Sequence, residues 1–303
     1  VVIGQRNGKS WITWIGTKPQ PSLRSVNTAA ESLDLNWSGS NGDVWQERVA
    51  RAVEKIRDGE LEKVVLARFV AGTSSKTINE RRLLNHLAHE YPSTWVYSHH
   101  GLIGATPELL VRLNRSLVTS RVLAGTIRKT GDDERDLALA GSLARSSKDL
   151  EEHEYAVRSV AESLSPFCSS MNVPESPFVL HLSNVMHLAT DVTGVLVDSS
   201  SPADIFDLAD RLHPSAAVCG TPRDIASRTI DEIEGISRGR YAGPIGWIDA
   251  RGDGEQGLAL RCGYLKDREV HAYAGCGIVA GSDAEHEAAE SKAKLLPIIN
   301  ALS

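Results

Sequence analysis

The sequence predicts an α/β (α+β) fold whose strands run largely antiparallel. Residues 95–122 contain several short apolar stretches separated by tight-turn residues, a spacing typical of an antiparallel meander. Residues 242–251 and 257–267 flank a Gly-Asp-Gly turn, which predicts a hairpin. Stretches with a helical apolar period stand between these groups of strands. The hairpin spacing of the strands is the reason to expect antiparallel sheets.

Length and composition describe a globular protein with a large core. The chain has 303 residues, of which 41% are hydrophobic and 24% charged, and we expect one catalytic domain over residues 1–303. It starts at Val1 rather than Met, so its true N-terminus could be absent. The net charge of −6 argues against a nucleic-acid partner, and no run of 18 apolar residues predicts a membrane span. No signal peptide is visible, and the four cysteines form no CxxC pair, which favours free thiols in a cytoplasmic protein.

The N-terminal part is expected to hold two strands, a loop and a helix. Residues 1–16 resemble two short strands joined by a turn at residues 6–9, and residues 17–42 are rich in Pro, Ser, Asn and Gly. Asp43 is a candidate cap for a helix over residues 44–58.

A buried strand is predicted over residues 61–72, which are almost wholly apolar and β-branched. Lys63 interrupts it, and two interpretations stay open. A lysine at a strand end usually reaches solvent. A lysine held among apolar neighbours would instead have a lowered pKa and could act as a base.

The next helix is predicted to start at a capping box formed by Thr77 and Glu80 and to end before Pro92. Beyond it, Glu108 follows Pro107 at the start of one of the meander strands. Its carboxylate could be a solvated strand end. It could also be a general acid, if its surroundings raise its pKa.

Small residues at 123–126 form a turn where a ligand can approach the backbone, and residues 132–165 predict two helices. Asp149 and Glu152 share one face of the second helix, so both carboxylates could point into a cleft. A charged, solvated helix face is the more common meaning of such a run.

The strand predicted at residues 185–197 carries His187 between apolar neighbours, where a satisfied core histidine is more common than a catalytic one. A short helix is expected at residues 202–212. Pro222 is well placed as the first residue of a helix that reaches about Glu234.

Polar residues fall in unusual places in the last third of the chain. Arg261 interrupts an apolar strand pattern, and two glycines stand at the end of the strand that follows. A helix over residues 284–301 carries Glu287, Glu290 and Lys294 on one face. These groups could converge on an anionic, metal-bound small molecule, although Glu290 and Lys294 could equally form an exposed i,i+4 pair.

Ten motifs occur in the same order as in the chorismate-utilising enzymes, and the chain resembles this family from about residue 44 to its end. Within the family it is most similar to the isochorismate synthases. The motifs are KVVLAR (63–68), GATPELL (104–110), LAGT (123–126), KDLEEH (148–153), MHLAT (186–190), HPSAAVCGTP (213–222), YAGPIGW (241–247), LALR (258–261), AGCGIV (274–279) and EHEAAESKAK (285–294).

The resemblance implies a fold of two packed, largely antiparallel sheets with outer helices and an active site between them. It also implies roles for three catalytic residues. Lys63 would activate water for attack at ring carbon C2 of chorismate, Glu108 would protonate the departing C4 hydroxyl, and His187 would lie beside the ring. These two proton transfers require a neutral lysine and a protonated glutamate, so both pKa values must be shifted toward neutrality.

The resemblance further implies a Mg²⁺ site and a cradle for chorismate. Glu152 and Glu290 would ligate the ion, with Asp149 and Glu287 as supporting carboxylates. Because chorismate is a dianion, Mg²⁺, the cationic side chain of Arg261 and backbone N–H groups would be needed to hold it among these acids. The residues implied to contact it are Ala124, Gly125, Thr126, Ala217, Tyr241, Arg261, Gly275, Gly277 and Lys294.

Two positions bear on the activity. Aminodeoxychorismate synthases carry a lysine at the position of Ala124, and salicylate and anthranilate synthases typically carry Thr at the position of Ala217. Ala124 therefore argues against an aminodeoxychorismate synthase, and Ala217 favours a reaction that stops at isochorismate. The alternatives are a salicylate synthase, an anthranilate synthase component I that needs ammonia or a glutaminase partner, and a relative that binds chorismate without turnover.

A monomer is expected, and the pathway served (menaquinone, siderophore or salicylate production) stays open.

Overall fold

The computed structural model describes residues 2–6, 9–13, 33–39, 42–198 and 202–302. The chain forms two compact units, Val1–Glu31 and Ser32–Ser303. The first unit contains an antiparallel hairpin of β1 (Val2–Arg6) and β2 (Lys9–Thr13), which confirms the two predicted strands. Every candidate site residue lies in the second unit.

One sheet of the second unit is built around β4 and is called the β4 sheet here. Its seven strands follow the order β12-β4-β16-β15-β6-β5, and β3 pairs with β4 beyond this path. All pairs are antiparallel. The strands are β3 (Leu35–Ser38), β4 (Lys63–Ser74), β5 (Trp95–His99), β6 (Leu102–Thr106), β12 (Gly220–Thr221), β15 (Cys262–Lys266) and β16 (Glu269–Ile278).

The other sheet is built around β8 and is called the β8 sheet. Its order is β10-β11-β8-β7-β14-β13, with β9 paired to β11, and its pairs are also antiparallel. The strands are β7 (Leu109–Asn114), β8 (Leu117–Arg128), β9 (Cys168–Asn172), β10 (Phe178–His181), β11 (Val185–Leu196), β13 (Pro244–Ile248) and β14 (Gly254–Leu258).

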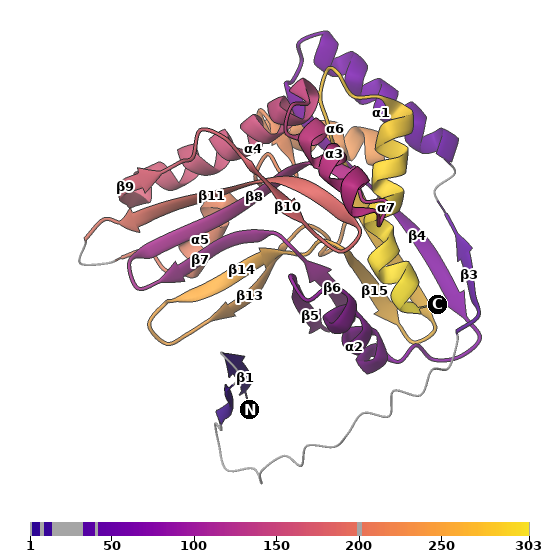
Figure 1. Cartoon of the computed structure of the whole chain (residues 1–303), viewed down its shortest axis with the longest axis horizontal. Coiled ribbons are helices and arrows are strands. Elements are labelled where there is room, and N and C mark those ends of the chain that lie inside the picture. The colour runs from indigo at the N-terminus through magenta and orange to yellow at the C-terminus, as the bar shows by residue number, and fades with distance from the viewer. Residues whose placement is uncertain (1, 7–8, 14–32, 40–41, 199–201, 303) are drawn as a thin grey trace. The chain divides into compact units, whose positions relative to one another are not determined.

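The two sheets share a core, and helices pack on each of them (Figure 1). Apolar side chains of β4, β6 and β15 share one core with those of β7, β8 and β11. In the β4 sheet, α1, α6 and α7 pack on β4 and β16, whereas α4 packs on β8 and β11. The helices are α1 (Gly42–Arg57), α2 (Glu80–Glu90), α3 (Asp133–Leu143), α4 (Ser147–Leu164), α5 (Ile205–Leu212), α6 (Arg223–Glu234) and α7 (Ala284–Leu302), with a 3₁₀ turn at Ser165–Phe167.

The chain passes directly from one sheet to the other at two places. The strand β6 in the β4 sheet continues through Pro107 and Glu108 into β7 of the β8 sheet, and β14 continues through residues 259–261 into β15. The two crossings are hydrogen-bonded to each other: Leu258 N donates to Glu108 O (3.1 Å), and Ala105 N donates to Arg261 O (3.2 Å). The single meander expected over residues 95–122 is therefore wrong, because its two hairpins belong to different sheets.

Most predicted elements are confirmed, with local exceptions. In α1 the apolar stripe of Trp45, Val49, Val53 and Ile56 is buried. The loop expected at residues 17–42 contains β3, which pairs with β4.

Two predicted helix starts are wrong. Asn79 caps α2 instead of Thr77, because its side chain accepts from Arg81 N at 3.1 Å, while Thr77 donates to Asp267. Helix α1 begins at Gly42, ahead of the expected cap. No helix in the described residues is long and apolar enough to cross a bilayer.

Candidate active site

A cavity lies between the two sheets. Twelve of the sixteen predicted site residues line it: Glu108, Ala124, Gly125, Thr126, Glu152, His187, Ala217, Tyr241, Arg261, Gly275, Gly277 and Lys294. Three others, Asp149, Glu287 and Glu290, line a second, wider pocket that also contains Thr126. Lys63 lines neither pocket.

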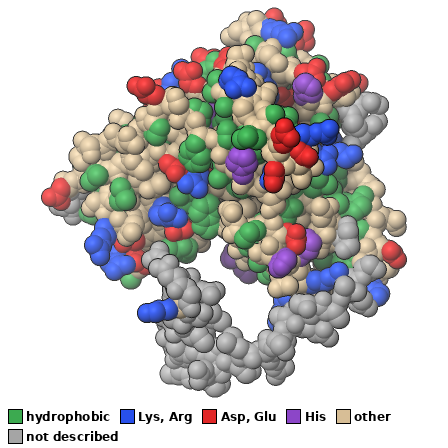
Figure 2. Space-filling model, viewed as in Figure 1, with side chains coloured by type: hydrophobic (Ala, Val, Ile, Leu, Met, Phe, Trp, Pro, Cys, Tyr) green, Lys and Arg blue, Asp and Glu red, His purple; other side chains and the backbone are tan. Residues whose placement is uncertain are grey.

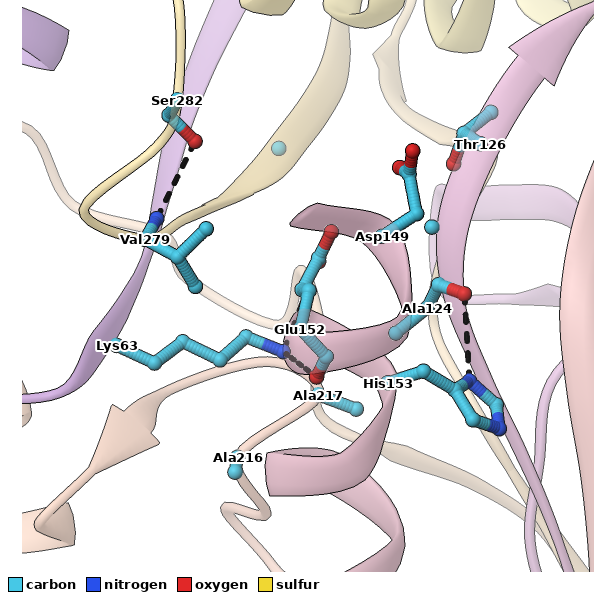
Figure 3. A network of polar contacts seen from close by, with 12 residues as sticks. Lys63, Ala124, Thr126, Asp149, Glu152, His153, Ala216, Ala217, Val279 and Ser282 are labelled. Atoms are coloured by element: carbon cyan, nitrogen blue, oxygen red, sulfur yellow. Dashed lines mark hydrogen bonds and ion pairs between the residues drawn. The ribbon is translucent and has the colours of Figure 1, made fainter. Parts of the chain in front are cut away.

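Lys63 is wholly buried at the start of β4, so the solvent-facing interpretation is wrong. Its Nζ donates to Glu152 O (3.2 Å) and lies 3.6 Å from Glu152 Oε1, and the two side chains point toward each other in Figure 3. Gly277 makes room for this pair, since a Cβ there would lie 1.9 Å from Glu152 Oε1. Burial lowers the pKa of Lys63 despite the nearby carboxylates.

Glu108 sits at the crossing between β6 and β7 and is 5% exposed, so it is not a solvated strand end. Burial raises the pKa of its carboxyl to about 8, outweighing the opposing effects of Arg261 and Lys63. Glu108 is therefore mostly protonated at pH 7.

His187, on β11, connects two parts of the site. Its Nε2 lies 2.8 Å from Nη2 of Arg261, and its Nδ1 lies 3.0 Å from Thr126 Oγ1 and 3.4 Å from Gly125 O. Burial and the neighbouring charge of Arg261 lower the pKa of His187 well below its usual value. Arg261 itself lies at the second crossing with φ of +49°, so its predicted place inside a strand is wrong.

Two lysine–glutamate ion pairs involve α4 and α7. Their four side chains, Lys148, Glu287, Glu290 and Lys294, are called the paired cluster here. Lys294 Nζ lies 2.5 Å from Glu290 Oε1 and donates to Gly275 O (3.0 Å), and Lys148 Nζ lies 2.8 Å from Glu287 Oε1. The side chains of Glu290 and Lys294 are each only 12% exposed, so an ordinary surface pair is excluded.

The pKa values of the two carboxyls of the paired cluster shift in opposite directions. Burial and the neighbouring Glu290 raise the pKa of Glu287 to about 7. Burial would also raise the pKa of Glu290, but Lys294 and Lys148 bring it below its usual value. Ser282 Oγ donates to Glu287 Oε1 at 2.9 Å, while Glu287 Oε2 is buried with no hydrogen-bond partner among the described residues.

These carboxylates suit a hard divalent cation. Oxygens of Glu287 and Glu290 and the sulfur of Cys276 lie within 4.8 Å of one another. Mg²⁺ takes oxygen ligands and not thiols, and Cys276 Sγ already donates to Glu287 O at 3.4 Å. The geometry thus gathers Glu287 with Glu290, whereas the carboxylate of Glu152 is turned to Lys63. The orphaned Glu287 Oε2 is the observation that best fits an added cation.

Glycines let the β16 backbone come close to the cavity. A Cβ on Gly275 would lie 2.9 Å from the Tyr241 hydroxyl, and Tyr241 stacks on Tyr273 with centroids 5.3 Å apart. Both Gly275 and Gly277 lie in the last part of β16, which confirms that they stand at the end of a strand. Gly125 has φ of +74° and lies against Asp149, where a Cβ would be 3.0 Å from that side chain.

Several buried side chains around the cavity were not identified from the sequence. Arg238 donates to Val218 O (2.9 Å) and Val65 O (2.6 Å) and pairs with Glu234, so it ties the loop that carries Ala217 to β4. The only signal was an arginine beside the YAGPIGW motif.

His153 comes directly after Glu152 on α4 and supports residues 123–126. These residues lie inside β8, so the turn predicted there is wrong. His153 Nδ1 donates to Ala124 O at 3.3 Å, as Figure 3 shows, and its Nε2 accepts from Thr190 Oγ1 at 2.8 Å. Lys148 was also missed, although it adjoins Asp149 in the KDLEEH motif.

Comparisons with known proteins agree with this geometry. A family model described as "Chorismate binding enzyme" matches residues 14–303. Isochorismate synthase DhbC of Bacillus subtilis is 38% identical over 265 residues, which are 84% of this chain and 66% of that protein. Isochorismate synthase MenF of the same organism is 35% identical over 283 residues, which are 92% of this chain and 58% of that protein.

A solved structure shows the same fold. The crystal structure of DhbC from Bacillus anthracis, described as a 2,3-dihydroxybenzoate-specific isochorismate synthase, has a TM-score of 0.85 and 36% identity over 90% of this chain and 75% of that chain. The chain spans 66% and 58% of the lengths of the two curated relatives. Both the fold predicted from the sequence and the family resemblance are confirmed: the chain belongs to the chorismate-binding enzyme family.

Proposed function

We propose that the protein is an isochorismate synthase, an isomerase that converts chorismate reversibly to isochorismate. Water would add at ring carbon C2, and the C4 hydroxyl would leave. The curated relatives named above carry this activity in their names. One water enters and one leaves, so the reaction has no net change in composition.

One observation carries this proposal. Lys63 and Glu108 are both buried, and burial shifts their pKa values toward neutrality from opposite directions. Both shifts favour the uncharged form, a neutral amine on Lys63 and a protonated carboxyl on Glu108. That is the pair of states needed to take a proton from the attacking water and to give one to the leaving hydroxyl. A protein that only bound chorismate would not need either group in its less common state.

The same residues can exchange roles when the reaction runs backward. Lys63, once protonated, would return its proton to the hydroxyl leaving C2, and the ionised Glu108 would take one from water that attacks C4. Neither step needs an outside oxidant or reductant, and the ring stays unsaturated rather than aromatic.

Binding of the dianionic substrate would rely on cations and backbone groups around the cavity. Arg261 and Lys294 line it together with the backbone of Gly275 and Gly277. A Mg²⁺ ion held by Glu152 and Glu290, with Glu287 and Asp149 beside them, would supply positive charge for the ring carboxylate. Glu152 would then have to leave Lys63, which removes a charge that keeps the pKa of Lys63 up.

Two alternatives remain within the same fold. A salicylate synthase would go on to eliminate pyruvate, and an anthranilate synthase component I would use ammonia instead of water. Ala217, at the cavity wall, argues against both outcomes. In Figure 2 acidic and basic side chains are interspersed over the face shown, and the net charge is −6, so an anionic substrate would be drawn by the site itself.

The decisive experiment is product chromatography after incubating the protein with chorismate and Mg²⁺ in the absence of ammonia. An isochorismate peak in equilibrium with chorismate, lost when EDTA is added, is the expected result. Salicylate with pyruvate would assign a salicylate synthase. Anthranilate formed only after ammonia is added would assign an anthranilate synthase. Size-exclusion chromatography of the same sample tests the expected monomer.

A further inference from the structure

The contacts of His187 determine which ring nitrogen carries its proton. An arginine side chain has only donors, so Nη2 of Arg261, at 2.8 Å, must donate to His187 Nε2. Nε2 therefore carries no proton and accepts this hydrogen bond with its lone pair. In a neutral imidazole the proton then lies on Nδ1, where it can be donated to Gly125 O or Thr126 Oγ1.

A doubly protonated ring does not fit this position. It would place an N–H of Nε2 against the guanidinium, so two donors and two positive charges would face each other in a buried site. Burial, Arg261 and Lys294 all lower the pKa of His187, in agreement with a neutral ring. The single lone pair of the ring is also already occupied by Arg261.

The other partner, Arg261, is partly buried and has no carboxylate partner. Among the described residues no acid lies within ion-pair distance of its guanidinium, and His187 is the one side chain that hydrogen-bonds it. An arginine has five donors, so most of them stay free at the cavity wall. A neutral acceptor fixes the guanidinium without cancelling its charge, whereas an aspartate in place of His187 would compete with an anionic ligand.

We propose that His187 is a positioning residue: held as the Nδ1–H tautomer between Gly125 and Arg261, it aims the guanidinium at a carboxylate of the substrate and exchanges no proton in the reaction. The inference rests on the proposed function for the identity of that substrate. It assigns to His187 a role different from that of Lys63 and Glu108.

Two substitutions of His187 distinguish a role in positioning Arg261 from a role in proton transfer. In His187→Gln the amide oxygen can reach the Nε2 position and accept from Arg261. In His187→Asn the amide reaches only the Nδ1 position. A charge-assisted hydrogen bond is worth roughly 10- to 100-fold in binding. We expect His187→Asn to raise the KM for chorismate by about that factor, with a much smaller change in kcat, and His187→Gln to recover much of the loss.

A double-mutant cycle tests whether His187 acts through Arg261. We expect His187→Asn/Arg261→Met to have about the same KM as Arg261→Met alone, because the histidine has nothing left to position. Losses that add independently would overturn the inference. A drop in kcat of about 10²–10⁴ in both His187 variants, with KM unchanged, would also overturn it and indicate proton transfer.

Nitrogen NMR of the ¹⁵N-histidine-labelled protein tests the tautomer without any substrate. The expected spectrum has a protonated Nδ1 and an unprotonated Nε2 for the signal that disappears in His187→Gln. A protonated Nε2 would refute the inference even if isochorismate is made. If the tautomer is as expected but chorismate is not turned over, the proposed function fails and the substrate-directed part of the inference fails with it.

Discussion

Glu108 lines the cavity and Glu290 the neighbouring second pocket, and both carboxyls are largely removed from solvent, yet their pKa values move in opposite directions. Glu108 has no cation within ion-pair distance among the described residues, so burial raises its pKa to about 8. Glu290 has Lys294 at 2.5 Å, and its pKa falls. A related contrast separates two lysines that both have a carboxylate partner. Lys63 lies 3.6 Å from Glu152 Oε1 and has a lowered pKa, whereas Lys294 lies 2.5 Å from Glu290 Oε1 and has a raised one. A close contact partner, rather than burial alone, decides which groups keep their charge.

The largest expected effect comes from removing Glu108, the proposed acid of the Lys63–Glu108 pair. Glu108→Gln keeps the shape of the side chain but cannot give up a proton, so kcat for isochorismate formation should fall by about 10²–10⁴-fold. Lys63→Ala should likewise abolish turnover while the protein stays folded. Product chromatography measures the rates, and thermal unfolding serves as the control. A Glu108→Gln enzyme with the wild-type rate would remove Glu108 from the mechanism.

Breaking the paired cluster should cost stability instead. Glu290→Gln leaves Lys294 buried beside a neutral amide, and loss of one partner of a buried pair destabilises by about 3–5 kcal/mol. Urea unfolding checks the change in the free energy of unfolding, and Glu108→Gln is the matched control, expected to be neutral or stabilising. Titration with Mg²⁺ should also show weaker binding. An unchanged titration would take Glu290 out of the metal site.

The pH dependence sharpens the comparison further. Because Glu108 must be protonated, kcat/KM should fall about tenfold per pH unit above about 8. It should also fall at low pH, as Lys63 becomes protonated. A profile that stays flat up to pH 10 would contradict the assignment.

The stability of the protein should depend on the same group. The folded-state pKa of Glu108 exceeds its ordinary value of 4.5, so its contribution to the free energy of unfolding is present below pH 4.5 and is lost as the pH rises through about 8.

The smallest effect is expected where both partners are exposed. Arg51 on α1 lies 3.2 Å from Glu232 on α6, and the two side chains are 51% and 52% exposed. Arg51→Ala should change the free energy of unfolding by less than about 1 kcal/mol, because solvent screens such pairs. A loss as large as that of Glu290→Gln would mean that burial is not what distinguishes the two pairs.

The sequence predicted helices and strands well where one pattern ran without interruption. Trp45, Val49, Val53 and Ile56 recur at helical spacing, and all are buried in α1. It failed where backbone pairing decides the structure, as at Leu35–Ser38, whose strand exists because β4 offers it a free edge. The division of β6 and β7 between two sheets also depends on long-range pairing that no local pattern records.

The candidate site was predicted mainly by resemblance, and physical patterns alone left each residue ambiguous. Lys63 could have been a solvated strand end until its burial was known. Lys148 and Arg238 were missed because their partners lie far away in the sequence, at Glu287 and Val65. A charged residue next to a motif is too common to indicate a buried pair.

The two crossings between the sheets place Glu108 and Arg261 on a single two-stranded ribbon that belongs to both sheets. If one sheet rotated slightly against the other, the acid and the arginine would stay nearly where they are. Glu152 on α4 and Glu290 on α7, carried by helices on different sheets, would move apart or together. A cation held by both carboxylates would then fix the opening angle of the cavity, so metal binding and closure around the substrate would be one event.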